Sequence, residues 1–246
     1  MVKGFYNLTS GMLTQGRKLD VISNNMTNTG TTGFKADAFS SSTFDEVLWR
    51  RVGNGQSADL GTMSYITAPS EISTDFMQGS LEETGLPLDF ALEGDGFFAI
   101  QTDNGRFYTR TGSFSIDEEG YLSLPGQGRV LDNTGDPILL VTDKIQADDS
   151  GNLFTDDGGF LGQIGVYAFD DTAVLEKSAQ GLFQSQTQPQ IATATVHHGM
   201  VERSNVDLIQ QMAAMIASQR AYQSAAEMTK LYDQVLSKVT TEVGRL

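Results

Sequence analysis

Residues 5–26 read FYNLTSGMLTQGRKLDVISNNM, and their apolar side chains recur at alternating steps of three and four residues if Gln15 fills one missing step. This is the heptad spacing of a helix with a narrow apolar stripe. The stripe consists of Phe5, Leu8, Met12, Leu19, Ile22 and Met26. Such a narrow stripe needs a partner, so we expect an N-terminal helix that packs along a coiled-coil seam.

A second long helix is predicted at the other end of the chain. From Ser204 to Val243 there is no proline or glycine, and good helix formers dominate. Steps of four and three recur at Ala221, Ala225, Met228, Tyr232, Val235 and Val239, and the stripe widens at Leu208, Met212, Met215 and Tyr222. We therefore expect a C-terminal seam that matches the N-terminal one.

The region between the two helices has a different character. The first helix should end near Asn28, because Thr29–Gly33 contains two glycines and β-branched residues. Residues 36–85 are rich in Ser, Thr, Gly and Asp, which predicts an extended, partly ordered connector. From residue 86 onward short apolar runs predict strands, and Asn104-Gly105 between two of them predicts a hairpin turn.

Two acidic stretches echo each other within this β-rich region. Ile116–Leu122 and Ala147–Leu153 each place acidic residues and a glycine between apolar positions, which predicts turns that join two strands. The whole pattern predicts an α+β fold with three parts. These are a terminal helical domain of residues 1–35 and 202–246, the connector of residues 36–85, and a mainly-β central domain of residues 86–201.

Charge is distributed unevenly along the chain. The formal net charge is -15, yet residues 1–35 carry +3 and residues 202–246 are balanced, so residues 36–201 carry -18. An acidic middle repels phosphate backbones and anionic headgroups, so we expect no nucleic-acid partner. We also expect no membrane insertion, because no apolar run is long enough to cross a bilayer, and the first twenty residues lack the apolar core of a secretory signal.

Sequence signals for catalysis or for bound cofactors are missing. Cysteine is absent, no Gly-x-Ser-x-Gly elbow occurs, and the only histidines are the adjacent pair His197 and His198. Gly94-Asp95-Gly96 and Gly126-Gln127-Gly128 lack the rest of a phosphate loop and are interpreted as β-turns. The acidic turns lack the ligand spacing of an EF-hand loop. We therefore predict no enzyme activity, no metal site and no cofactor.

Ser23–Asn28 (SNNMTN), followed by Thr31–Lys35 (TTGFK), resembles the N-terminal signature of bacterial flagellar rod and hook proteins, with Met26 and Thr27 where the usual form has Leu and Ala. Val201–Asp207 (VERSNVD), Met215-Ile216 and Gln219–Tyr222 (QRAY) are similar to the matching signature at the other end of the family. Gly94–Phe98 and Tyr108–Phe114 resemble segments of the β-domain that rod proteins share.

This resemblance implies a subunit of the flagellar basal-body rod, with the proximal rod favoured over the distal rod. The terminal helices would form an inner coiled-coil layer of a helical tube, and the β-domain would lie outside. The chain would be exported by the flagellar type III apparatus and would bind itself and other rod subunits. Asn24, Asn25, Asn28, Gly33 and Phe34 would shape the helix exit, Ser204 and Asn205 would cap the returning helix, and Gln219, Arg220 and Tyr222 would face neighbouring subunits.

Two other classes of protein remain open from the residues alone. One is a secreted binding module, in which the β-domain engages a glycan or peptide and the helices serve as an oligomerisation stalk. That class would predict an exposed aromatic groove, and Trp49 is the only tryptophan. The other is a hydrolase with paired carboxylates, for which the 25 acidic residues of the middle single out no pair.

Overall fold

The computed structural model of the chain describes residues 2–43, 47–53, 56–63, 67–140, 142–170, 172–178, 181–192 and 194–243. The chain folds as two compact units. Unit 1 comprises residues 1–27, 37–73 and 207–246, and unit 2 comprises residues 28–36 and 74–206. A helix near each end and a mainly-β region between them confirm the predicted α+β class.

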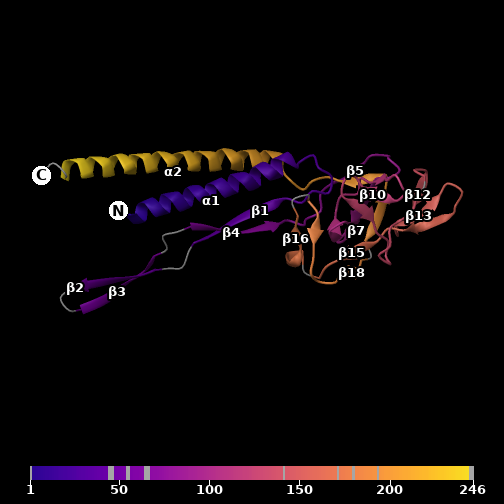
Figure 1. The fold of residues 1–246 in the computed structure, drawn as a ribbon, viewed down its shortest axis with the longest axis horizontal. Helices are drawn as coiled ribbons and strands as arrows, with labels where there is room; N and C mark the ends of the chain where they lie inside the picture. Colours follow the sequence, from indigo (N-terminus) through magenta and orange to yellow (C-terminus); the bar gives the residue numbers. More distant parts are fainter. Residues whose placement is uncertain are drawn as a thin grey trace. The chain divides into compact units, whose positions relative to one another are not determined.

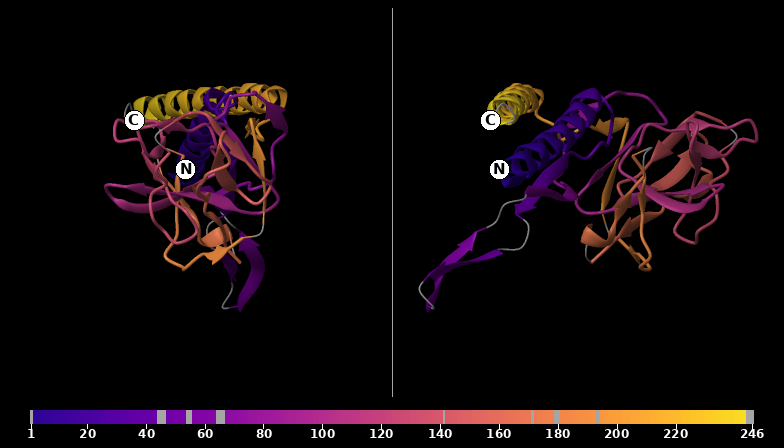
Figure 2. Two further views of the ribbon diagram at one scale, coloured as in Figure 1. Left: turned by 90° about the vertical axis from the view of Figure 1, so that its right-hand side faces the viewer. Right: turned by 60° about the vertical axis from the view of Figure 1, so that its left-hand side comes forward.

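Unit 1 contains the two long helices, α1 (Val2–Thr27) and α2 (Leu208–Val243). They run in opposite directions and lie against each other (Figures 1 and 2). The end of α1 beside Asn28 agrees with the prediction, whereas α2 begins four residues later than Ser204. Over the described residues, neither helix combines the length and the hydropathy that a bilayer-crossing segment requires.

The face that α2 turns toward α1 differs from the predicted seam. Tyr232 packs beside Gly4, and the Thr229 hydroxyl lies 3.8 Å from the sulfur of Met12. Both residues belong to a row of buried or half-buried positions at steps of four and three, namely 211, 215, 218, 225, 229, 232 and 236. This row shares Ala225 and Tyr232 with the predicted seam. Where the seam has Met228 and Val235, the row has the next residues, Thr229 and Leu236.

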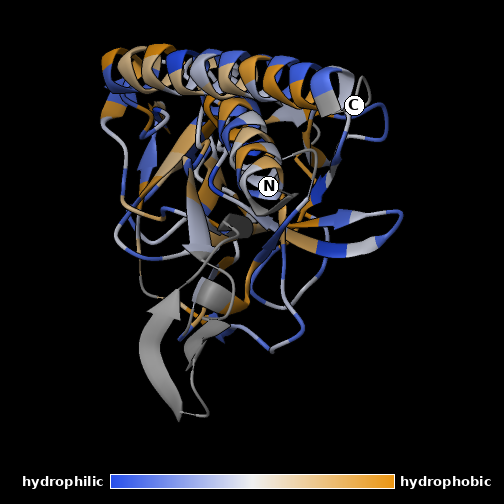
Figure 3. Ribbon diagram, turned by 90° about the vertical axis from the view of Figure 1, so that its left-hand side faces the viewer, coloured by the Kyte–Doolittle hydropathy of each residue, from blue (hydrophilic) through white to orange (hydrophobic). Residues whose placement is uncertain are grey.

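Three seam residues of α2 do not face α1 within this chain, since Met228, Val235 and Val239 are 55%, 58% and 40% exposed. The physical reason is that the contact face is built from small and polar residues such as Ser218 and Thr229. Orange and blue positions alternate along both helices in Figure 3, so hydropathy alone does not define one stripe.

The predicted seam of α1 lies next to the face that contacts α2. Ile22 is buried, Leu8, Met12, Leu19 and Met26 are half-buried, and Phe5 is 42% exposed. The buried positions of α1 also include Thr14, Val21 and Asn25. The helix pair within one chain is thus partly polar, and the coiled-coil layer stays a prediction.

The described residues between 37 and 74 form paired strands instead of the partly ordered connector that the sequence predicts. Strand β1 (Asp37–Thr43) pairs with β4 (Thr67–Thr74), and β2 (Val47–Gly53) forms an antiparallel ribbon with β3 (Gln56–Met63). The composition disguised β1 and β4, because Ser and Thr supply eight of their 15 residues. The predicted boundaries at residues 85 and 86 also differ from the observed division near residue 74.

Unit 2 contains the β-domain, whose central sheet has nine strands. In this sheet β7 lies between β8 on one side and β11 and β15 on the other (Figure 1). The strands of unit 2 and a short 3-10 helix are β5 (Leu81–Glu83), β6 (Phe90–Glu93), β7 (Phe97–Thr102), β8 (Gly105–Thr109), β9 (Ser115–Ile116), β10 (Leu122–Leu124), β11 (Gly128–Val130), β12 (Ile145–Ala147), β13 (Asn152–Thr155), β14 (Phe160–Gln163), β15 (Val166–Ala168), η1 (Thr172–Val174), β16 (Glu176–Lys177), β17 (Phe183–Gln184), β18 (Gln190–Ile191), β19 (Thr195–His198) and β20 (Met200–Glu202). Outside the sheet, β5 pairs with β20, β6 with β19, and β13 with both β12 and β14.

Strand β7 separates two hydrophobic clusters. Phe98 and Ile100 belong to the main core, whereas Phe97 and Ala99 belong to a second cluster with Tyr108 and other aromatic residues. This division follows from the alternation of side chains along a strand. Because both faces are buried, β7 is apolar throughout its first four residues.

The predicted hairpin is confirmed, with its turn one residue early. Strand β7 pairs with β8 up to Thr102 and Gly105, so Asp103 and Asn104 fill the two-residue loop. Gly105 opens β8 with a φ of 122°, a value that favours glycine. The Thr102 hydroxyl accepts a hydrogen bond from the amide of Asn104 and donates one to the carbonyl of Gly105.

Both predicted acidic turns are confirmed. In each, one carboxylate oxygen accepts two backbone N–H groups, from residues 119 and 121 for Asp117 and from residues 150 and 152 for Asp148. A third turn of the same kind forms at Asp132, which accepts the amides of residues 134 and 136. These carboxylates serve as the anchors of local turns.

Candidate functional site: a junction of three chain segments

Three segments of unit 2 that are far apart in the sequence meet at one place. Residues 28–36 follow α1, residues 74–80 follow β4, and residues 200–206 precede α2. Backbone hydrogen bonds join them, from Gly33 N–H to the Glu202 carbonyl at 2.7 Å and from Arg203 N–H to the Ser80 carbonyl at 2.9 Å. We call this place the junction.

A buried ion cluster lies at the centre of the junction. The Lys35 Nζ is 2.6 Å from Glu202 Oε1, and Arg110 Nη1 is 3.3 Å from Glu202 Oε2. The side chains of Lys35, Glu202 and Arg110 are 1%, 1% and 4% exposed. Each of the three side chains therefore comes from a different part of the sequence, and each is held away from water.

The terminal polar groups of the cluster also find backbone partners. Glu202 Oε1 also accepts the N–H of Gly79 at 2.9 Å, and Lys35 Nζ donates to the carbonyl of Met77 at 2.8 Å. Arg110 Nη2 donates to the carbonyl of Gly94 at 2.6 Å. The buried charges thus tie residues 77–79 and 94 to the same point.

Burial dominates the electrostatics of the two cations. It lowers the pKa of Lys35 below its ordinary value, against the hydrogen bond and the charge of Glu202, which raise it. Burial likewise lowers the pKa of Arg110, against the attraction of Glu202. Removing one partner would leave the others buried and undercompensated, which is why such clusters tolerate substitution poorly.

Two asparagines of the family signatures bind adjacent residues of the backbone. In unit 2, Asn205 Oδ1 accepts the N–H of Ala36 at 2.7 Å, and its Nδ2 donates to the Asp75 carbonyl at 2.9 Å. In unit 1, Asn25 Oδ1 accepts the N–H of Asp37 at 2.9 Å, and its Nδ2 donates to the carbonyl of the same residue at 2.8 Å.

The prediction that Ser204 and Asn205 cap α2 was wrong. The cap is Asp207, whose Oδ1 accepts the N–H groups of Ile209 at 2.9 Å and Gln210 at 3.1 Å. The Asn205 side chain instead binds backbone groups of the junction. The Ser204 hydroxyl accepts the N–H of Val206 in a local turn.

Gly33 and Phe34 pack closely inside the junction. Gly33 has a φ of 67°, and a Cβ atom there would lie 2.3 Å from the backbone nitrogen of Thr111. The ring of Phe34 is buried, with the Lys177 ammonium 3.9 Å from its centroid. Lys177 Nζ also donates to the Lys35 carbonyl at 2.7 Å. Only glycine fits at the first position, and the second anchors a cation over its ring.

The other predicted site residues lie elsewhere. Asn28 contributes its carbonyl and its side-chain oxygen to a turn with Thr31. Asn24 is exposed near the end of α1, and Gln219, Arg220 and Tyr222 are exposed on α2 in unit 1. Sequence reasoning missed the roles of Lys35, Arg110 and Glu202, although all three lie inside the motifs that carry the resemblance.

The junction has the chemistry of a structural contact. Its charged groups are saturated by one another and by backbone groups, apart from the Nε of Arg110, which is buried without a hydrogen-bond partner. Within the part of the chain that the structure describes, no group of three or more His, Cys, Asp or Glu side chains gathers as metal ligands would. The arrangement fixes where the chain leaves and re-enters the β-domain.

Comparison with known families matches three stretches of the chain. Residues 5–35 match the flagella basal body rod protein family, residues 91–180 match the D1 domain of the flagellar hook proteins FlgE/F/G, and residues 197–242 match the C-terminal region of the flagellar basal body rod FlgEFG proteins. Lys35, Arg110 and Glu202 each fall in a different one of these stretches.

Similar curated proteins cover nearly the whole chain. The flagellar basal-body rod protein FlgG of Bacillus subtilis is 31% identical over 265 aligned positions, which cover 97% of this chain and 98% of the relative. FlgF of Caulobacter vibrioides is 29% identical over the full length of both chains, and FlgF of Mesorhizobium japonicum is 32% identical over 94% of this chain and 93% of the relative. The chain therefore belongs to the family of flagellar basal-body rod proteins, which are structural components of the basal body and not enzymes.

Proposed function

We propose that this chain is a rod subunit that is exported by the flagellar type III apparatus and polymerises with itself and with other rod subunits through its terminal helices. The observation that carries the proposal is the apolar surface of α2. Its large exposed apolar side chains, 39% to 80% accessible, are Leu208, Ile209, Met212, Ile216, Tyr222, Met228, Leu231, Val235 and Val239.

Exposed apolar side chains that recur along most of one helix favour a role in binding other subunits. Met228, Val235 and Val239, which the sequence predicts to line a seam, belong to this exposed set. They support a seam that forms between subunits instead of within one. Contacts of this kind between different faces of identical subunits build a helical polymer where the rotation between subunits does not close into a ring.

The junction favours a role in transmitting force between the two units. The chain passes between unit 1 and unit 2 at four points in the sequence, next to residues 27, 36, 73 and 206. These four crossings are the covalent links between the two units, so force can pass along them. The buried cluster of Lys35, Arg110 and Glu202 ties them together inside unit 2, which suits a subunit of a rotating shaft.

Within the rod, we favour the proximal position. Alignment with FlgF of Caulobacter vibrioides needs only 250 positions for the 246 residues of this chain, whereas alignment with FlgG of Bacillus subtilis needs 265. The length of this chain is therefore nearer to that of this FlgF than to that of this FlgG. Export through a narrow channel suits a chain that contains no cysteine and so forms no disulfide.

The proposal is tested by sedimentation of the purified full chain together with circular dichroism. The double variant Ile216→Lys with Leu231→Lys places two charges on the apolar surface of α2 and should abolish the sedimenting polymer without loss of helix. Gln210→Lys with Ser224→Lys is the matched control, since both residues are exposed and polar. Polymerisation that survives the first double variant would overturn assembly through α2.

A further inference from the structure

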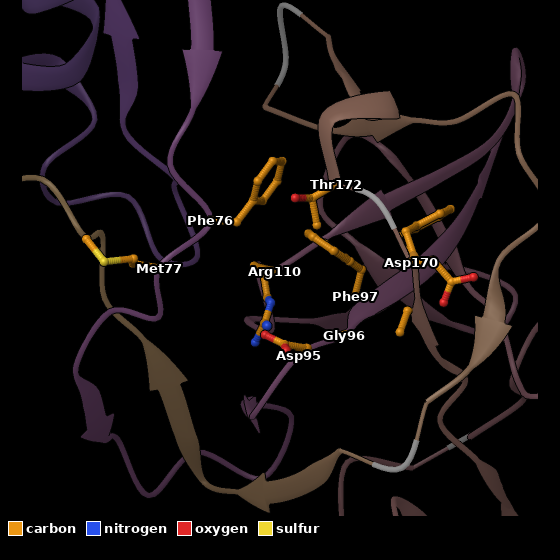
Figure 4. Close-up of a pocket in the computed structure, with 10 residues that line it drawn as sticks. Phe76, Met77, Asp95, Gly96, Phe97, Arg110, Asp170 and Thr172 are labelled. Carbon is orange, nitrogen blue, oxygen red and sulfur yellow. The ribbon is translucent and has the colours of Figure 1, made fainter.

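Unit 2 contains a pocket that the family match does not explain. It has a volume of about 450 Å³ and lies at one end of the central sheet, where β7 begins and β15 ends. Figure 4 shows its lining, which comes from three separate stretches around residues 76, 96 and 170 together with Arg110. The cavity is large enough for one bulky side chain and its backbone.

Three aromatic rings, those of Phe76, Phe97 and Phe169, form part of the pocket wall. Phe97 is 4% exposed and lies edge-on to Phe76 at 5.7 Å and to Phe169 at 6.0 Å between ring centroids. Met77, also part of the lining, is 70% exposed. Fixed aromatic rings with an exposed methionine at the rim form a site for an apolar side chain.

Arg110 forms a fixed part of the pocket wall. It is 4% exposed, with its guanidinium 5.4 Å from the centre of the Phe97 ring. Its two terminal nitrogens are hydrogen-bonded and its Nε is buried from solvent, so the side chain is held in place and an entering group does not reach that Nε. The occupant should therefore be selected by its shape and its apolar character.

Charge indicates where such an occupant comes from. Unit 2 holds 21 acidic and seven basic side chains, a formal charge of -14, and two carboxylates, those of Asp95 and Asp170, line the pocket and are exposed. A second unit 2 would be repelled. Residues 1–27 carry three basic side chains and one acidic one, and unit 1 as a whole has a charge near zero. Unit 1 of another copy does not meet this repulsion, and its residues 1–27 carry an excess of basic side chains.

We propose that this pocket receives an apolar side chain from unit 1 of a second copy of the chain. This inference rests on the proposed polymerisation and adds a second contact to it. The junction then has a further role, because Glu202 holds the guanidinium of Arg110 in the wall of the pocket.

The chain has no cysteine, so a single introduced cysteine can be labelled uniquely. We would label Met77→Cys with a benzophenone maleimide, irradiate the full chain under conditions in which it sediments, and map the products by mass spectrometry. The expected result is a covalent dimer joined to residues of unit 1. Asp157→Cys, exposed in the turn after β13, is the control and should give at least tenfold less dimer.

The outcomes separate this inference from the proposed function. A polymer that sediments normally but gives no dimer from position 77, or gives dimers joined to unit 2, overturns the pocket and leaves polymerisation intact. If the chain does not polymerise at all, the proposed function fails and this inference fails with it.

A second variant tests the cavity itself. Thr172→Trp fills the pocket and should raise the protein concentration needed for sedimentation by about tenfold with an unchanged melting temperature, a change that corresponds to one binding contact of moderate strength. Thr187→Trp, at an exposed position outside the lining, should leave that concentration unchanged. Equal behaviour of the two variants would overturn the inference.

Discussion

Lys35 and Glu202 are 167 positions apart in the sequence, yet their side chains meet at 2.6 Å in a place where each is 1% exposed. The pair joins the segment that follows α1 to the strand that precedes α2. Because Arg110 shares the same carboxylate, three distant segments depend on one buried acid. The stability of unit 2 should therefore be sensitive to each member.

Lys35→Met removes the ammonium and leaves the Met77 carbonyl and one oxygen of Glu202 short of a donor. We expect the free energy of unfolding to fall by about 3 kcal/mol, the usual cost of breaking a buried ion pair from one side. Urea unfolding of the full chain measures it. Lys144→Met, at an exposed lysine, is the control. A loss for Lys35→Met that equals the control would show that the cluster is not important for stability.

The junction also predicts where unit 2 can be cut. A fragment of residues 28–206 keeps Gly33, Lys35 and Glu202 and should unfold cooperatively as a β-rich monomer. A fragment of residues 36–201 lacks Lys35 and Glu202, so Arg110 stays buried without its carboxylate. We expect the shorter fragment to give a poorly dispersed NMR spectrum. Two fragments of equal stability would contradict the role given to the junction.

Gly33→Ala should be among the most damaging small substitutions. The φ of 67° is strained for alanine, and the added Cβ would lie 2.3 to 2.5 Å from backbone atoms of Arg110 and Thr111, which cannot move aside freely. We expect a loss of about 3 kcal/mol or more. Gly30→Ala provides the matched control, since nothing lies within 4 Å of its Cβ position. Thermal unfolding of both variants gives the comparison, and equal melting temperatures would count against it.

Neighbouring residues of α2 should behave in opposite ways. Leu236 is half-buried in the row that contains the α1 contacts, whereas Val235 is 58% exposed. Leu236→Ala should lower the stability of the monomer by about 1 to 2 kcal/mol, and Val235→Ala by less than about 0.5 kcal/mol. Val235→Ala should instead weaken sedimentation of the polymer. If Val235→Ala lowered the stability of the monomer more than Leu236→Ala, Val235 would belong to the contact between α1 and α2 within one chain.

Local patterns predicted local structure well. The absence of glycine and proline from residues 204–243 predicted α2, and the asparagine-glycine pair at residues 104 and 105 predicted the β7–β8 hairpin. Both depend on residues close in sequence. The seam of α2 was displaced at alternate positions because Ser218 and Thr229 take part in the contact, and a search for apolar periodicity passes over them.

Long-range pairing was beyond the reach of the sequence. Strands β1 and β4 are separated by more than twenty residues, and their Ser-rich composition gives no register signal. Lys35 and Glu202 were interpreted as parts of a signature and not as a buried pair, because charged residues are mostly found at the surface. Only the fold brings the three charges together, so the centre of the junction could not be predicted from spacing.

The turn at Asp148 makes a prediction about pH. The side-chain amide of Asn152 holds the pKa of Asp148 below its ordinary 3.8. Slight burial opposes this shift, and the backbone N–H groups of Asn152 and Ser150 add to it. The folded state therefore favours the carboxylate, so this contribution to stability is complete above pH 3.8 and is lost as the pH falls through the lower folded value. Asn152→Ala removes the principal donor and should move the NMR titration midpoint of the Asp148 carboxyl carbon up toward 3.8. Asn104→Ala, in the β7–β8 loop, is the control and should leave that midpoint unchanged. If Asn152→Ala also left the midpoint unchanged, the backbone amides alone would stabilise the charged carboxylate.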